Sequence, residues 1–130
     1  MTLLTLLFLC TLFVHAQIDE AQMKANMKDA ERYLKGNGGK PKDKSKALQL
    51  YKQCAEAGNA KAMNAVGMQY RLGLGTAIDN DEAINWFTKA ANAGYAGAWY
   101  NIGLIYKFGS GRPIDYQKAY ELCSMQLIEL

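Results

Sequence analysis

Apolar and small residues recur three or four positions apart along most of the chain, which is the spacing of one buried stripe on an α-helix. The stripe predicts helices over residues 18–35, 43–58, 60–72 and 96–108, and two more that begin at residues 79 and 115. No window keeps the strict apolar–polar alternation of a half-buried β-strand between turn residues. The expected fold class is therefore all-α, with six helices in three pairs.

Aspartates and glycines mark where these helices start and stop. Asp43, Asp79 and Asp115 each stand where a helix begins. An aspartate there can accept hydrogen bonds from the free backbone N–H groups of the first turn. Glycine takes the left-handed conformation that favours a helix end, and glycine-rich segments close three of the helices at residues 36–39, 73–75 and 109–111.

The sequence also repeats itself at a fixed spacing. The three aspartates are evenly placed (79 − 43 = 36 and 115 − 79 = 36). Other residues keep the same offset: Ala47, Ala83 and Ala119, Ala55 and Ala91, Gly58 and Gly94, Ala62 and Ala98, Gly67 and Gly103, and Tyr70 and Tyr106. A period of this length is typical of stacked repeat arrays, in which each unit buries its apolar face on the next. Arrays of this kind usually bind other molecules rather than catalyse reactions.

Two glycines lie inside predicted helices at the same phase of the repeat. A glycine at such a position costs about 1 kcal/mol of helix stability relative to alanine. The placement of Gly67 and Gly103 therefore predicts that a neighbouring helix comes too close to leave room for a side chain.

This combination of residues resembles the Sel-one-like repeat family, a branch of the tetratricopeptide-type repeat proteins. The family pattern is carried by Ala62, Val66, Gly67, Tyr70, Gly73, Gly75, Asp79, Ala83, Trp86, Phe87, Lys89, Ala90, Ala91 and Gly94, and again by Ala98, Ile102, Gly103, Tyr106, Gly109, Gly111, Asp115, Lys118, Ala119 and Tyr120. The resemblance implies a right-handed α-solenoid of three antiparallel helix pairs. Trp86 and Trp99 then take packing positions rather than forming a ligand pocket.

The repeat divides the chain into units over residues 17–57, 58–93 and 94–130. The first is the least regular, because Asp29 takes the place that Val66 holds in the second unit. A polar outer face suits a terminal, capping unit. The last helix loses the family ending over residues 125–130, which makes it either a C-terminal cap or the end of a truncated chain, with an apolar tail that could seek a partner.

The chain opens with an apolar stretch at residues 3–14, too short to cross a bilayer, followed by the small-residue site Val14-His15-Ala16. We expect residues 1–16 to be a signal peptide, and the mature protein to be secreted or periplasmic with no stable membrane anchor. No Lys or Arg precedes the apolar stretch, so a buried first helix is the alternative.

Few residues suggest chemistry. The only histidine, His15, lies in the expected signal, and Cys54 and Cys123 cannot form a zinc site alone. We expect no disulfide within the chain, with both thiols in the core, and no cofactor or metal. The formal net charge of +3 is too small for a typical nucleic-acid binder. No serine is followed three residues later by lysine, which argues against a β-lactam-hydrolysing enzyme of the kind known among some relatives.

The remaining candidate for a functional site is the surface of the solenoid. The family places a binding groove along the first helix of each pair, and its positions fall here on Lys24, Met27, Glu31, Lys61, Asn64, Met68, Arg71, Tyr100, Leu104, Lys107 and Phe108. This mixture suits a protein or peptide of acidic and apolar character. The resemblance thus implies a monomeric, non-catalytic protein-interaction module, for example an antidote to a secreted toxin, or an adaptor or assembly factor for an envelope complex. A structural spacer is the alternative.

Overall fold

A computed structural model describes residues 2–5, 18–108 and 113–129 of the chain. Apart from one helical turn at residues 3–5, the helices are α2 (Glu20–Lys35), α3 (Lys44–Glu56), α4 (Ala60–Leu72), α5 (Asn80–Asn92), α6 (Gly97–Phe108) and α7 (Tyr116–Glu129). No strand occurs in these segments, so the all-α fold class and the six predicted helices are confirmed. The expected signal cleavage site and the Gly109–Gly111 loop lie outside the described residues.

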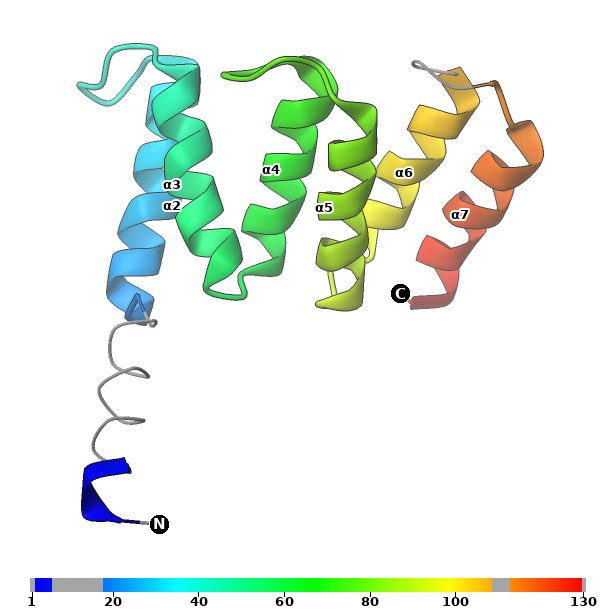
Figure 1. Ribbon diagram of the computed structural model, residues 1–130. Helices are drawn as coiled ribbons and strands as arrows, with labels where there is room; N and C mark the ends of the chain where they lie inside the picture. Colours follow the sequence, from blue (N-terminus) through cyan, green and yellow to red (C-terminus); the bar gives the residue numbers. More distant parts are fainter. Residues whose placement is uncertain (1, 6–17, 109–112, 130) are drawn as a thin grey trace.

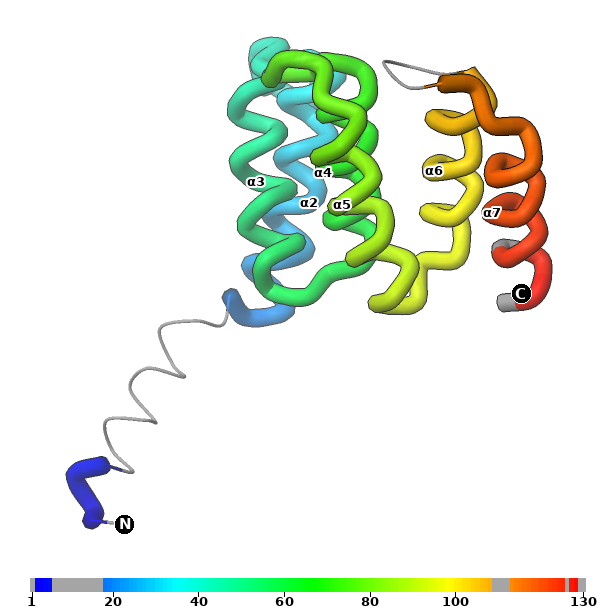
Figure 2. The backbone as a smooth tube through the Cα atoms, turned by 45° about the vertical axis from the view of Figure 1, so that its right-hand side comes forward, coloured from blue at the N-terminus to red at the C-terminus, as the bar shows by residue number. Residues whose placement is uncertain are grey.

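The helices form a single row in which each packs on its neighbours in the chain (Figures 1 and 2). Helices α2, α4 and α6 are the first members of the three pairs, and α3, α5 and α7 are the second members. Contacts run from α2 to α3, α3 to α4, and so on to α7. This arrangement is the predicted α-solenoid, since each pair buries its apolar face on the next pair.

Each predicted capping aspartate ties the two helices of its pair together. The side chains of Asp43, Asp79 and Asp115 accept hydrogen bonds of 2.8–2.9 Å from the backbone N–H three residues ahead. The backbone N–H of the same aspartates donates to the carbonyls of Tyr33, Tyr70 and Tyr106 at the end of the preceding helix, over 2.8–3.0 Å. Each aspartate thus begins one helix and bonds it to the preceding helix. Such a cap contributes about 1 kcal/mol to stability.

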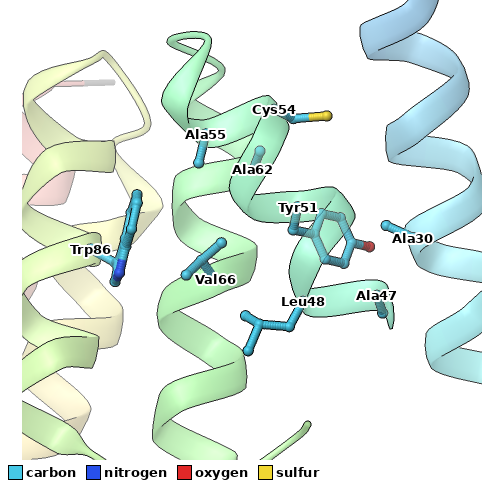
Figure 3. Packing of buried hydrophobic residues seen from close by; sticks show 9 residues of the cluster. All are labelled: Ala30, Ala47, Leu48, Tyr51, Cys54, Ala55, Ala62, Val66 and Trp86. Carbon is cyan, nitrogen blue, oxygen red and sulfur yellow. The ribbon is translucent and has the colours of Figure 1, made fainter. Parts of the chain in front are cut away.

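The core consists of two clusters that share residues where they meet. The first is built between α2, α3 and α4 and is closed by Trp86 of α5. Figure 3 shows Tyr51 directed toward Ala30 of α2 while Val66 faces Trp86. The second joins α5, α6 and α7, and Met63 and Tyr70 of α4 pack against both clusters. The apolar core is therefore continuous along the row.

Small residues set the helix spacing, as the sequence predicted. A Cβ built on Gly67 would lie 2.7 Å from the ring of Phe87, which is fully buried. A Cβ on Gly103 would lie 2.9 Å from Cys123 Sγ and 3.1 Å from the Ala119 carbonyl oxygen. Real Cβ atoms essentially never approach other atoms as closely as the distances to Phe87 and Cys123, so the two glycines permit the contact between the helices of each pair.

The two ends of the row differ in polarity. On α2, half-buried Asp29 forms ion pairs with Arg32 (3.3 Å) and Lys40 (3.6 Å). Ala25 of α2 is exposed. On α7, by contrast, several large apolar side chains are exposed.

We predict that Gly67→Ala lowers the free energy of unfolding by about 1–2 kcal/mol, because overpacking against Phe87 outweighs the gain in helix propensity. Thermal and denaturant unfolding would measure this change. Asn85→Ala, on the exposed face of α5, is the matched control and should be close to neutral. A Gly67→Ala protein as stable as the parent would contradict the close packing.

Candidate functional site

The predicted groove residues do not all line one hollow. Lys24, Met27 and Lys61 line a hollow between α2 and α4, together with Glu31. Tyr100, Leu104 and Lys107 line a second hollow between α6 and α7. Asn64, Met68, Arg71 and Phe108 line neither.

The larger hollow, called here the α2–α4 hollow, has a volume of about 650 Å³. Its apolar lining comes from three helices: Met23, Met27 and Leu34 of α2, Tyr51 of α3 and Ala65 of α4. The remaining lining residues are Asn59 and the charged Glu20, Lys24, Lys28, Glu31, Lys35 and Lys61. The hollow therefore offers apolar surface framed by charges, four of them positive and two negative.

The two glutamates are already paired with lysines of the same helix. Glu20 lies 2.8 Å from Lys24, and Glu31 accepts a hydrogen bond from Lys35. That hydrogen bond and the charge of Lys35 lower the pKa of Glu31, and the charge of Lys61 lowers it further. Lys28 and Lys61 have no carboxylate within ion-pair distance in the described part of the chain. These two lysines give the hollow its unneutralised positive charge.

Between the two hollows, α4 and α6 are joined directly. The Asn101 amide donates to the Asn64 side-chain oxygen across 2.8 Å, so the polar end of Asn64 finds its partner within the chain. Met68 packs against the second core cluster. The predicted groove residue Asn64 is therefore bonded to the next first helix, α6.

Arg71 differs from these two residues. Its Nε is buried without a hydrogen-bond partner, and the side chain is half-buried. No carboxylate among residues 2–5, 18–108 and 113–129 lies within 4.0 Å of its guanidinium. Arg71 is therefore an unneutralised cation, but it lies outside both hollows.

The second hollow, the α6–α7 hollow, has a volume of about 290 Å³. It is lined by Tyr100, Gly103, Leu104, Lys107, Tyr116, Ala119, Tyr120 and Cys123. The nearby Phe108 is 63% exposed. This hollow is mostly apolar, and Lys107 is the one charged residue among its described lining residues.

The cysteine predictions are partly correct. Cys54 is fully buried, and its Sγ donates to the Met23 carbonyl oxygen over 3.7 Å. Burial raises the pKa of the Cys54 thiol, which makes it a poor nucleophile. Cys123 was expected in the core but is partly exposed, because no described helix covers that side of α7. Within the described residues, Cys54 and Cys123 are not bonded to each other.

Neither a metal site nor a membrane span is found among the described residues. In the part of the chain that the structure describes, no three His, Cys, Asp or Glu side chains lie close enough to hold a metal ion. None of the described helices combines the length and apolar character needed to cross a bilayer. Trp86 packs in the first core cluster, as predicted, and the Lys89 ammonium lies 4.4 Å from the centre of its ring.

Sequence reasoning missed part of the α2–α4 hollow, including Met23, Lys28, Leu34, Tyr51 and Ala65. These residues were missed because the prediction used only the groove positions of the family. The spacing of Lys24, Lys28, Glu31 and Lys35 along one face of α2 was the available signal. No sequence signal pointed to Tyr51, because its place in the lining of the hollow depends on how α3 packs beneath α2 and α4.

We predict that iodoacetamide labels Cys123 at least about tenfold faster than Cys54 at pH 8, because Cys54 is buried and its raised pKa leaves less thiolate. Mass spectrometry of the peptides after a short labelling pulse would measure both rates. Labelling in denaturant, where the two rates should become equal, is the control. Equal rates in the folded protein would show that the first core cluster is open.

Comparisons with known proteins agree with this architecture. The Sel1 repeat model matches residues 24–59, 60–95 and 97–125. A Sel1 repeat protein from Oxalobacter formigenes is 32% identical with a TM-score of 0.69, over 85% of this chain and 44% of that one. A protective antigen of uropathogenic Escherichia coli strains, which has an SLR fold, is 30% identical with a TM-score of 0.73, over 85% of this chain and 23% of that one.

The chain thus spans less than half the length of either structure. No curated protein matches it significantly. Sel1 repeat proteins generally mediate protein–protein interaction and are typically non-catalytic scaffolds. The repeat matches cover most of the sequence, and the chain belongs to the Sel1 repeat family.

Proposed function

We propose that this chain is a non-catalytic protein-interaction module that binds an acidic, amphipathic segment of a partner protein in the α2–α4 hollow. The observation that carries the proposal is the unpaired positive charge of Lys28 and Lys61 beside an apolar lining. A segment that fits would place apolar side chains in the hollow and carboxylates opposite these lysines.

The size and chemistry of the hollow support a peptide ligand. A volume of about 650 Å³ can enclose a few anchoring side chains. Met23 and Met27 are unbranched and polarisable, so they can adapt to anchors of different shapes. Burying such anchors supplies affinity, whereas the lysines supply orientation and speed of association.

The absence of a recognisable reaction centre supports a binding role over the β-lactam-hydrolysing alternative. Cys54 is buried, and the sequence holds no serine followed three residues later by lysine. Purified protein incubated with a chromogenic β-lactam should therefore give no turnover above buffer. Turnover that follows the protein through purification would favour the enzyme.

Export of the mature protein is the second part of the proposal. It rests on the apolar stretch and small-residue site at residues 3–16. In a secreted or periplasmic setting, the module would act as antidote to a secreted toxin or as an adaptor or assembly factor in an envelope complex.

We predict that peptides selected on the immobilised chain from a phage-displayed library carry Asp or Glu beside two apolar residues three or four positions apart. Combining Lys28→Glu with Lys61→Glu should weaken their binding about tenfold or more, because two favourable charge pairs become repulsive. Fluorescence anisotropy at low and high salt would measure the affinity. The matched control combines Lys42→Glu with Lys46→Glu, two exposed lysines that line neither hollow. Selected peptides that are basic, or that bind both double variants equally, would exclude this site.

We also predict that the full chain, expressed in E. coli, is recovered from the periplasm with Gln17 as its first residue. N-terminal sequencing and intact mass would check this, because cleavage after Ala16 removes residues 1–16. Ala16→Tyr should prevent cleavage. The control Gln17→Ala should still be cleaved after Ala16. Cytosolic protein that keeps residues 1–16 would contradict export.

A further inference from the structure

One polar group in the α2–α4 hollow has no partner within the described part of the chain. The Tyr51 side chain of α3 lines the hollow and is only 8% exposed. Its hydroxyl points toward α2 (Figure 3), and it makes no hydrogen bond to another described residue. A nearly buried hydroxyl without a partner lowers stability, so its presence needs an explanation.

The repeat shows that this hydroxyl is particular to the first unit. One period later the position of Tyr51 is held by Phe87 (87 − 51 = 36), which is fully buried against Gly67. In the first unit Ala30 takes the place of Gly67 and faces Tyr51. Because a Cβ on Gly67 would lie 2.7 Å from the Phe87 ring, the Tyr51 ring cannot lie as close to Ala30. Tyr51 thus keeps its contact with the hollow, whereas Phe87 is closed off completely.

The other uncharged polar residue of the described lining is already satisfied. The Asn59 side-chain oxygen accepts a hydrogen bond from the backbone N–H of Ala62 over 2.9 Å. Its amide nitrogen donates to Met23 Sδ over 3.3 Å. Asn59 therefore caps α4 and bonds it to α2. The Tyr51 hydroxyl remains as the uncharged group that a ligand in the hollow can engage.

A negative charge lies near this hydroxyl. Burial raises the pKa of Tyr51, and the charge of Glu31 raises it further, so the hydroxyl keeps its proton and can donate it. Glu31 also lines the hollow and accepts a hydrogen bond from Lys35, but a carboxylate has room to accept more. A ligand carboxylate would be repelled by Glu31 at this point. A neutral group that accepts from Tyr51 and donates to Glu31 would satisfy both.

We propose that the Tyr51 hydroxyl donates a hydrogen bond to a side-chain amide, Asn or Gln, of the bound segment, and that the NH₂ group of this amide donates to Glu31. The proposal rests on the binding role proposed for the α2–α4 hollow, and it names the group that selects among acidic, amphipathic segments. An amide carries its acceptor and its donors on separate atoms, so it can bridge these two residues. In a segment whose apolar residues follow helical spacing, the backbone carbonyls are bonded within the helix. The acceptor for Tyr51 must then come from a side chain.

Two parallel phage selections test this assignment, one on the immobilised chain and one on its Tyr51→Phe variant. Peptides selected on the parent should carry Asn or Gln beside their apolar anchors, and peptides selected on Tyr51→Phe should lose that preference. Tyr51→Phe should weaken binding of a parent-selected peptide about tenfold, because the amide is left without its donor. Replacing the amide residue of the peptide by Leu should weaken binding to the parent by a similar factor.

The two changes together should cost little more than either alone, because they remove the same bond. Fluorescence anisotropy would measure the four affinities. Equal loss of affinity for peptides with and without an amide would overturn the assignment of Asn or Gln.

Stability separates a ligand contact from a structural role. Tyr51→Phe should unfold at the same denaturant concentration as the parent or at a higher one, since no bond within the described chain is lost. Tyr70→Phe is the matched control, because Tyr70 lines neither hollow and its hydroxyl accepts a hydrogen bond of 2.7 Å from Lys52. That change should lower the midpoint of unfolding and leave peptide binding unchanged. A Tyr51→Phe protein as destabilised as Tyr70→Phe would count against a hydroxyl reserved for a ligand.

The same peptides distinguish this proposal from the binding role of the hollow. Peptides that are weakened by the combined Lys28→Glu and Lys61→Glu variant, but bind Tyr51→Phe as tightly as the parent, would keep the hollow and exclude its hydroxyl. Peptides weakened by Tyr51→Phe alone would keep the hydroxyl and exclude recognition by the two lysines. Binding that none of these changes affects, or selections that enrich no peptide, would exclude both.

Discussion

The close approach of neighbouring helices at glycine and alanine positions is the constraint on which this structure depends. Phe87 can lie fully buried against α4 only because Gly67 has no side chain. The same close packing at Gly103 brings α6 onto Ala119 and Cys123 of α7. Because each pair is tightly closed, its remaining apolar face is free to pack on the next pair, and the row of helices follows.

The hollows arise where this regular packing is interrupted. Between α4 and α6, the Asn101 amide donates a hydrogen bond to the Asn64 side-chain oxygen. Between α2 and α4, the corresponding space stays open over Tyr51, and lysines surround it. Next to α6 and α7, no described helix continues the row, and the α6–α7 hollow stays open. The candidate binding surfaces are thus the irregular parts of a regular fold.

This distinction decides how much could be predicted from sequence. Helix ends followed from local features such as Asp79, whose capping role needs only its own first turn. The close contact at Gly67 followed because a glycine inside a helix lowers its stability, and close packing on a neighbouring helix offsets that loss. The hollows could not be predicted in the same way. Whether Asn64 faces solvent depends on Asn101, which is 37 residues away (101 − 64 = 37), and the exposure of Cys123 depends on what packs against the outer side of α7.

The contact pattern has a consequence for how the chain folds and unfolds. Helices pack mainly on their neighbours in sequence, so most contacts are local, and local contacts favour rapid folding. An interior helix such as α5 is held from both sides, whereas α7 packs mainly on α6. Opening of the native state is therefore expected to begin at the end helices of the described row, α2 and α7, and to proceed inward, and whatever covers either helix would slow unfolding of the array.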